Sequence, residues 1–227
     1  MERPRILLTG FGPFPGVPTN PSAWLAETLA EGLPAPDLHG RIHVRIFPTE
    51  WQAAGLVADL CETLQPHVMI HFGVSEHAKT FRIEHSAHNR TAPRADAGGA
   101  LPAGPVISAE GAERLDTALP AAALARHLQT NGVAAVTSHS AGHYLCNFLY
   151  YHSLAWALRQ SAPPLVLFVH VPPMSGQDGD FSEELLLRGG QEILRFTLAF
   201  AGERGSIRAA IHPGLAQRET LLGAEDA

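Results

Sequence analysis

Arg5-Ile6-Leu7-Leu8-Thr9, followed directly by Gly10, is a short apolar run of the kind that forms a buried strand. Similar runs further along the chain alternate with stretches of helical periodicity. We expect strands at about 41–47, 67–72, 133–138 and 165–171, and helices at about 21–33, 52–64, 120–130, 146–159 and 182–200. This alternation is typical of parallel strands covered by helices. The sequence therefore predicts the α/β class, as a single three-layer α/β/α domain with a mostly parallel, twisted mixed sheet.

The chain of 227 residues is long enough for one sizeable core and too short to need two. We expect residues 1–205 to form one domain and the Gly- and Ala-rich residues 206–227 to be a poorly ordered C-terminal tail. Between about 75 and 104 no regular period is visible. A stretch of that length inside a compact domain is usually functional.

Composition argues against several classes of partner. The formal net charge is -6 and the 16 Lys and Arg residues are scattered, so we expect no nucleic-acid surface. No apolar run approaches the roughly 20 residues that span a bilayer, so we expect no membrane segment and a soluble, cytoplasmic protein. The two cysteines, Cys61 and Cys146, stand in different contexts, which disfavours a disulfide framework.

Thirteen histidines allow a metal hypothesis, which the spacings weaken. His85 with His88, and His139 with His143, are spaced so that each pair could share a helical face. Neither pair forms the His-Glu-x-x-His motif, and the cysteines add no chelating spacing. We therefore expect no metal and no cofactor.

Three polar side chains lie where the ligand site of an α/β sheet is expected, at the carboxyl ends of strands. Cys146 begins a helix, where the helix dipole favours a thiolate. His170 is near the end of the apolar strand at 165–171, and Glu84 is in the irregular segment that follows the strand at 67–72. Together they could act as nucleophile, base and orienting carboxylate. Separately, they could be a buried packing cysteine, a satisfied histidine and a solvated carboxylate. Cys61 shares the apolar side of its helix and is interpreted as core filling.

The loop after the first strand is glycine-rich, but it is not a phosphate loop. The run Gly10-Phe11-Gly12-Pro13-Phe14-Pro15-Gly16 lacks the Lys-Ser/Thr pair, and its prolines and aromatic rings would block a cradle of backbone amides. A tight turn that carries Phe11 and Phe14 suits a flat apolar ligand better. The alternative is that both phenylalanines belong to the core.

Several motifs resemble the pyroglutamyl peptidase I family, also called pyrrolidone-carboxylate peptidase. They are Leu7-Leu8-Thr9-Gly10-Phe11-Gly12-Pro13-Phe14 with Asn20-Pro21-Ser22, Ala141-Gly142-His143-Tyr144-Leu145-Cys146-Asn147 with Tyr150-Tyr151, and Phe168-Val169-His170-Val171-Pro172. The resemblance covers roughly residues 5 to 175 in the same order. Relatives commonly have a Glu-Arg-Val-Ala-Ile-Asn-like run, whereas this chain has Glu84-His85-Ser86-Ala87-His88-Asn89 and so departs at three positions.

The resemblance implies a cysteine omega-peptidase that releases N-terminal pyroglutamate from peptides through a thioester acyl-enzyme. It implies Glu84, Cys146 and His170 as the catalytic residues and an α/β/α domain that assembles as a homo-oligomer, a dimer or tetramer. The substrate-binding residues would be Phe11, Phe14, Tyr144, Leu145 and Val74, with Arg94 near the oxyanion.

Two other functions remain open on the sequence. A nucleoside phosphorylase or nucleosidase could use a related α/β architecture and stack a base on the aromatic loop, although only fold analogy supports it. A catalytically silent relative could bind modified peptide ends. Inactivation by a thiol alkylator would separate the peptidase from the nucleosidase.

Overall fold

The computed structural model describes residues 4–32, 41–75, 78–174 and 181–211, with side chains described up to residue 204. Six strands form the central sheet in the order β2-β1-β3-β8-β4-β7. In this order they are β2 (Ile42–Phe47), β1 (Ile6–Phe11), β3 (Val68–Val74), β8 (Leu165–Val171), β4 (Phe81–Glu84) and β7 (Ala135–Ser138). Neighbours are parallel except for β4 and β8, which run antiparallel.

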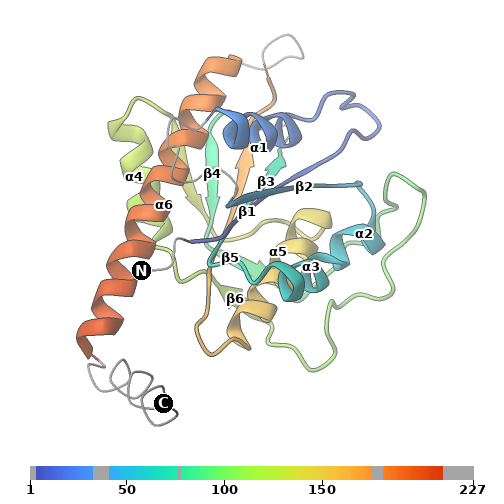
Figure 1. Cartoon of the computed structure of the whole chain (residues 1–227). Coiled ribbons are helices and arrows are strands. Elements are labelled where there is room, and N and C mark those ends of the chain that lie inside the picture. The colour runs from blue at the N-terminus through green and yellow to red at the C-terminus, as the bar shows by residue number, and fades with distance from the viewer. Residues whose placement is uncertain (1–3, 33–40, 76–77, 175–180, 212–227) are drawn as a thin grey trace.

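Helices cover both faces of this sheet (Figure 1). On one face are α1 (Pro21–Glu31), α4 (Ala121–Thr130) and α6 (Glu183–Ile211), all of which contact the sheet, and α6 contacts both α1 and α4. On the other are α2 (Trp51–Gly55), α3 (Val57–Leu64) and α5 (Leu145–Leu158), together with the hairpin of β5 (Ser86–His88) and β6 (Arg114–Asp116). The arrangement confirms the predicted α/β/α class with a mostly parallel mixed sheet.

Each face of the sheet has its own core because strand side chains alternate. Ile70, Phe72 and Val169 pack in the cluster with α1, α4 and α6. Met69 and Phe168, their neighbours along the same strands, pack in the cluster under α5. The sheet is therefore buried on both sides, which explains the near-continuous apolar runs that predicted β1, β3 and β8.

The turn from β1 into α1 is fixed by close backbone contact. Asn20 caps α1 by accepting a hydrogen bond from Ser22 N, with Pro21 at the first helical position, as predicted. A Cβ at Gly10 would collide with the backbone of Ser22, so only glycine lets the two segments approach this closely. The following residue, Phe11, donates its N–H to Ser22 Oγ at 3.0 Å. The aromatic loop after β1 is thereby held at the carboxyl edge of the sheet.

Three elements differ from the sequence-based expectation. The helix predicted at 52–64 is two helices that meet at Leu56, directly after Gly55, because glycine has poor helix propensity. The irregular segment contains β4 and β5, whose lengths of four and three residues are too short to give a clear period. The last helix continues to Ile211 instead of ending near residue 200. The remainder of the expected tail, 212–227, lies outside the described residues.

Candidate active site

Glu84 and His170 form a buried pair across adjacent strands. Glu84 is the last residue of β4, not part of a loop as the sequence suggested, and β4 pairs antiparallel with β8, which carries His170. Nδ1 of His170 donates to Oε1 of Glu84 at 2.8 Å, and the carboxylate is fully buried. The backbone carbonyl of Glu84 accepts a hydrogen bond from the Tyr150 hydroxyl at 3.0 Å. The carboxylate therefore fixes the ring so that Nε2 is its free nitrogen.

Cys146 is the second residue of α5, and its side chain lies over Gly73 of β3, a residue without a side chain. A Cβ at Gly73 of β3 would come within 2.9 Å of the Cys146 Sγ and within 2.8 Å of the Phe168 ring. Gly73 is the register partner of His170 on the neighbouring strand. The sulfur therefore sits over the sheet at the level of the histidine, with room that only glycine leaves.

Asn147 anchors the start of α5 to the segment that follows β4. Its fully buried amide accepts from His88 N at 2.8 Å and donates to His88 O at 2.7 Å and Arg90 O at 3.0 Å. Because Asn147 directly follows Cys146, these bonds fix the helix terminus, whose unpaired N–H groups lie next to the sulfur.

The electrostatics of His170 favour a protonated ring. Burial opposes the charged form, but the charge of Cys146, hydrogen bonding with Cys146, and the hydrogen bond and charge of Glu84 outweigh it and raise the pKa of His170 to about 9. At neutral pH the arrangement therefore holds an imidazolium between a carboxylate and a sulfur that can carry negative charge. A thiolate of this kind is a nucleophile for acyl transfer.

A cavity of about 280 Å³ opens in front of the sulfur and contains every pocket residue expected from the sequence. Its lining residues are Phe11, Phe14, Asn20, Thr49, Val74, Ser75, Arg94, Ala141, Tyr144, Leu145, Cys146 and His170. None of these side chains is acidic. The structure thus brings the predicted aromatic residues, Arg94 and two of the three predicted catalytic residues to one cavity, with Glu84 buried behind His170.

Four lining residues were not anticipated: Asn20, Thr49, Ser75 and Ala141. Asn20 was identified as a helix cap, yet its amide nitrogen also donates to Gly12 O at 3.0 Å. The Thr49 hydroxyl donates to the same carbonyl at 3.1 Å. These two bonds hold the aromatic loop in place. For Asn20 the signal was the motif Asn20-Pro21-Ser22, whereas for Thr49 no sequence signal existed.

One wall of the cavity is built around Tyr144. The Arg94 guanidinium lies 4.7 Å from the centre of the Tyr144 ring, and the Tyr144 hydroxyl donates to Ala95 O at 2.9 Å. Trp51 packs edge-on against Tyr144 at 5.2 Å. Asp96 accepts from Trp51 N at 2.9 Å, and its pKa is lowered by that backbone hydrogen bond and by others from residues 98–100. Trp51 and Asp96, which sequence reasoning missed, thus support the wall from behind.

Comparison with known proteins shows to which family the chain belongs. A family model described as pyroglutamyl peptidase matches residues 4–183, which is more than half of the chain. The chain belongs to the pyroglutamyl peptidase family. It is 35% identical over 179 residues to the human pyroglutamyl-peptidase 1, a match that covers 77% of this chain and 82% of the relative. The pyrrolidone-carboxylate peptidase of Cupriavidus pinatubonensis is 34% identical over 205 residues, covering 86% and 93% of the two chains.

Solved structures of the pyroglutamyl peptidase family share the fold. The pyrrolidone carboxyl peptidase of Thermococcus litoralis superposes with a TM-score of 0.78 at 24% identity, covering 89% of this chain and 96% of that one. Pyroglutamyl peptidase I of Bacillus amyloliquefaciens gives a TM-score of 0.75 at 26% identity, covering 87% and 97%. Membership in this family confirms the predicted cysteine peptidase class and leaves the nucleosidase alternative without support.

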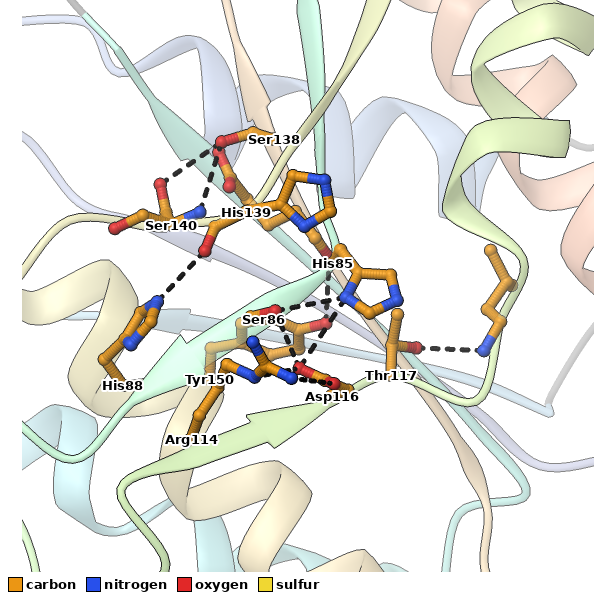
Figure 2. A network of polar contacts seen from close by, with 12 residues as sticks. His85, Ser86, His88, Arg114, Asp116, Thr117, Ser138, His139, Ser140 and Tyr150 are labelled. Atoms are coloured by element: carbon orange, nitrogen blue, oxygen red, sulfur yellow. Dashed lines mark hydrogen bonds and ion pairs between the residues drawn. The ribbon is translucent and has the colours of Figure 1, made fainter.

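The histidine pairs that suggested a metal are arranged differently from the sequence hypothesis. His85 faces His139, with ring centres 5.3 Å apart, and His88 faces His143 at 6.2 Å. Each contact therefore joins the region of β5 to the loop between β7 and α5, instead of joining the two members of one motif. Figure 2 shows His85 beside Ser86 and Asp116. It also shows the hydrogen bond between His88 and the carbonyl of His139, and the distance from His88 Nε2 to that oxygen is 3.0 Å. Within the described ranges no three His, Cys, Asp or Glu side chains converge as metal ligands. These contacts tie the region of β5 to the loop that precedes Cys146.

Among the described residues, no helix combines the length and the apolar character needed to cross a bilayer. Cys61 is fully buried under α5, where its thiol contacts the Met69 sulfur at 3.2 Å. Its interpretation as core filling is confirmed.

Proposed function

We propose that this chain hydrolyses the amide bond after an N-terminal pyroglutamyl residue of peptides, with Cys146 as nucleophile, His170 as acid and base, and Glu84 as the carboxylate that orients His170. The single observation that carries the proposal is the continuous arrangement of these groups. Glu84 accepts from Nδ1 of His170 at 2.8 Å, and Cys146 contributes to raising the pKa of the same ring. Membership in the pyroglutamyl peptidase family supports the choice of substrate.

The cavity suits a pyroglutamyl group because that group is flat and uncharged. An ordinary peptide N-terminus is an ammonium, which a site would bind with a carboxylate. Pyroglutamate has a lactam instead, so it needs an apolar slot and a few hydrogen bonds to its N–H and C=O. Phe11, Phe14 and Tyr144 supply aromatic surface, with Val74 and Leu145 beside them, and none of the described residues that line the cavity is acidic.

In the proposed first step, the thiolate adds to the pyroglutamyl carbonyl carbon. The backbone N–H groups at the start of α5 stabilise the oxyanion, and we propose that the Arg94 guanidinium assists them from the same cavity. Collapse of the adduct breaks the C–N bond while His170 gives its proton to the leaving amine. The products are the shortened peptide and a thioester on Cys146.

Replacing Cys146 by serine tests the proposal directly. We expect Cys146→Ser to lose at least about 1,000-fold of the release of fluorophore from pyroglutamyl-7-amido-4-methylcoumarin, since a hydroxyl is a far weaker nucleophile here than a thiolate. The matched control is Cys61→Ala, which removes the other thiol and should keep the activity. Wild-type rates in Cys146→Ser would remove Cys146 from the mechanism. A pyroglutamyl peptide that the wild-type protein binds without cleavage would favour the silent binding protein instead.

We further propose that the protein works in the cytoplasm as a homo-oligomer, a dimer or tetramer, and that residues 1–205 form its domain. Both cysteines are free thiols, which a reducing compartment would maintain. Sedimentation equilibrium of the full chain would give a monomer mass if the oligomer proposal is wrong.

A further inference from the structure

Arg82 lies beside the catalytic pair although it lines no part of the cavity. It is on β4, two residues before Glu84, so both side chains point to the α5 face of the sheet. In the antiparallel pairing of β4 with β8, Arg82 is directly opposite His170. Side chains opposite each other in such a pair are close neighbours, about 5 Å apart at Cβ. Arg82 therefore adjoins both members of the buried pair.

The guanidinium is held by two contacts. Its Nε lies 3.6 Å from Oε1 of Glu84, the same oxygen that accepts from His170. Its Nη2 donates to the Ser138 hydroxyl at the end of β7 at 2.8 Å. Figure 2 shows Ser138 above His85, where its hydroxyl also contacts Ser140. The Arg82 side chain is 42% exposed, so the charge reaches solvent while its Nε reaches the buried carboxylate.

The buried carboxylate needs a cation that persists through the reaction. Oε2 of Glu84 is buried and has no hydrogen-bond partner within the described part of the chain, where only Oε1 is compensated. An ionised carboxylate buried without a charge partner is strongly disfavoured. Once His170 has given its proton to the leaving amine, its ring is neutral. Among the described residues, Arg82 is then the cation that remains within 4 Å of Glu84.

We propose that Arg82 is a positioning residue of the active site that holds a positive charge beside the Glu84–His170 pair while His170 is neutral, and thereby sets the pH range in which the acyl-enzyme is hydrolysed. This inference rests on the proposed function. In that step water adds to the thioester carbonyl and gives one proton to Nε2 of His170. Collapse of the adduct breaks the C–S bond, releases pyroglutamic acid, and leaves the Cys146 thiolate beside the His170 imidazolium. The step requires a neutral ring, which a nearby guanidinium favours.

Other titratable groups face the pair and stay in place when Arg82 is changed. From α5 these are Cys146, which is a thioester in the acyl-enzyme, and Tyr150, whose pKa is raised mainly by burial. From the hairpin side they are His85 and Asp116. On β3, burial lowers the pKa of His71 to about 3, so it stays neutral. Arg82 is thus the group whose removal changes the charge next to Glu84 by one unit.

The test is the pH dependence of deacylation in Arg82→Gln and Arg82→Lys. The p-nitrophenyl ester of pyroglutamic acid has a good leaving group, so its steady-state rate after a burst reports hydrolysis of the thioester. In Arg82→Gln we expect the acidic limb of this rate to move up by about half to one pH unit, because loss of a positive charge favours protonation of the pair and water screens part of the effect. The plateau rate at high pH should stay within about threefold of wild type.

Two further variants keep the result interpretable. Arg82→Lys retains the charge and should restore most of the wild-type profile, whereas Ser138→Ala removes one anchor of the guanidinium and should give a smaller upward shift. Arg126→Gln removes an exposed arginine on α4 and should leave the profile unchanged. An unshifted limb in Arg82→Gln, or equal shifts in Arg82→Gln and Arg82→Lys, would overturn the inference. Since the Cys146→Ser result tests the nucleophile by itself, this inference can fail while the proposed function stands, and the two failures are distinguishable.

Discussion

The two faces of the sheet are built from the same strands but serve different ends. On β3, β4 and β8, the side chains that face α1, α4 and α6 are large and apolar, as at Phe72, Ile83 and Val169. Their immediate neighbours face α5 and include Gly73, Glu84 and His170. Because side chains alternate along a strand, one face can be a dry core while the other carries charge one residue away. Function is thus confined to one layer, and single substitutions can address either face separately.

We expect the largest difference between the two faces when the adjacent residues Glu84 and Ile83 are substituted. In Glu84→Gln the amide no longer stabilises an imidazolium and can present the wrong hydrogen-bonding group to His170, so we expect kcat/KM to fall by about 100- to 10,000-fold. Ile83→Val on the other face should cost about 1 kcal/mol of stability and leave kcat/KM unchanged. Thermal melts beside steady-state kinetics measure both. Wild-type kinetics in Glu84→Gln would mean that another residue orients the ring.

A second contrast uses one glycine on each face. A methyl group at Gly73 would press on the Cys146 sulfur and the Phe168 ring, and displacing the nucleophile by even 1 Å can cost about 100-fold in rate, so Gly73→Ala should lose about that much in kcat/KM. Gly189 of α6 packs against the Phe81 ring, with which an added Cβ would collide. Gly189→Ala should cost about 1–3 kcal/mol of stability with little change in kcat/KM per folded molecule. The contrast would fail if Gly73→Ala lost stability but not activity.

The protonated state of His170 links the active face to folding. In the unfolded chain the histidine has a pKa of about 6.5, whereas in the folded chain it is about 9, so proton binding favours the fold. The contribution is complete below about pH 6.5 and is lost as the pH rises through about 9. Relative to His170→Gln, the wild type should therefore lose about 1–3 kcal/mol of unfolding free energy between pH 6 and pH 9.5, measured by urea denaturation. A difference between the two proteins that does not change with pH would contradict the ion pair.

The sequence predicted those features that depend on residues close together in the chain, and it missed those that depend on contacts between distant residues. The apolar runs of β1 and β8 are local signals and gave the sheet, and the positions of Cys146 and His170 after or within such strands gave two catalytic candidates. Glu84 was found through its motif but assigned to a loop, because the four residues of β4 alternate too briefly to be recognised. Trp51 and Asp96 were missed, since their bond joins residues 45 positions apart and no local pattern records it. The sequence therefore predicts the residues whose positions follow from a strand or a helix terminus. It does not predict the residues that support the wall of the cavity, because their positions depend on tertiary packing.

The smallest effect is expected at the second cysteine, which tests whether the contrast holds within the active layer itself. Cys61 and Cys146 both belong to the layer that contains α5, but burial and the neighbouring Glu62 raise the pKa of the Cys61 thiol to about 12, so it stays protonated and inert. We expect iodoacetamide to modify one residue per chain, Cys146, with loss of activity. Cys61→Ala should keep kcat/KM within about twofold, take up the same single label, and lose about 1 kcal/mol of stability from the small cavity beside Met69. Mass spectrometry that finds label at both cysteines, or a large loss of activity in Cys61→Ala, would contradict this expectation. Either result would mean that a thiol in this layer is reactive without lying at a helix terminus beside His170.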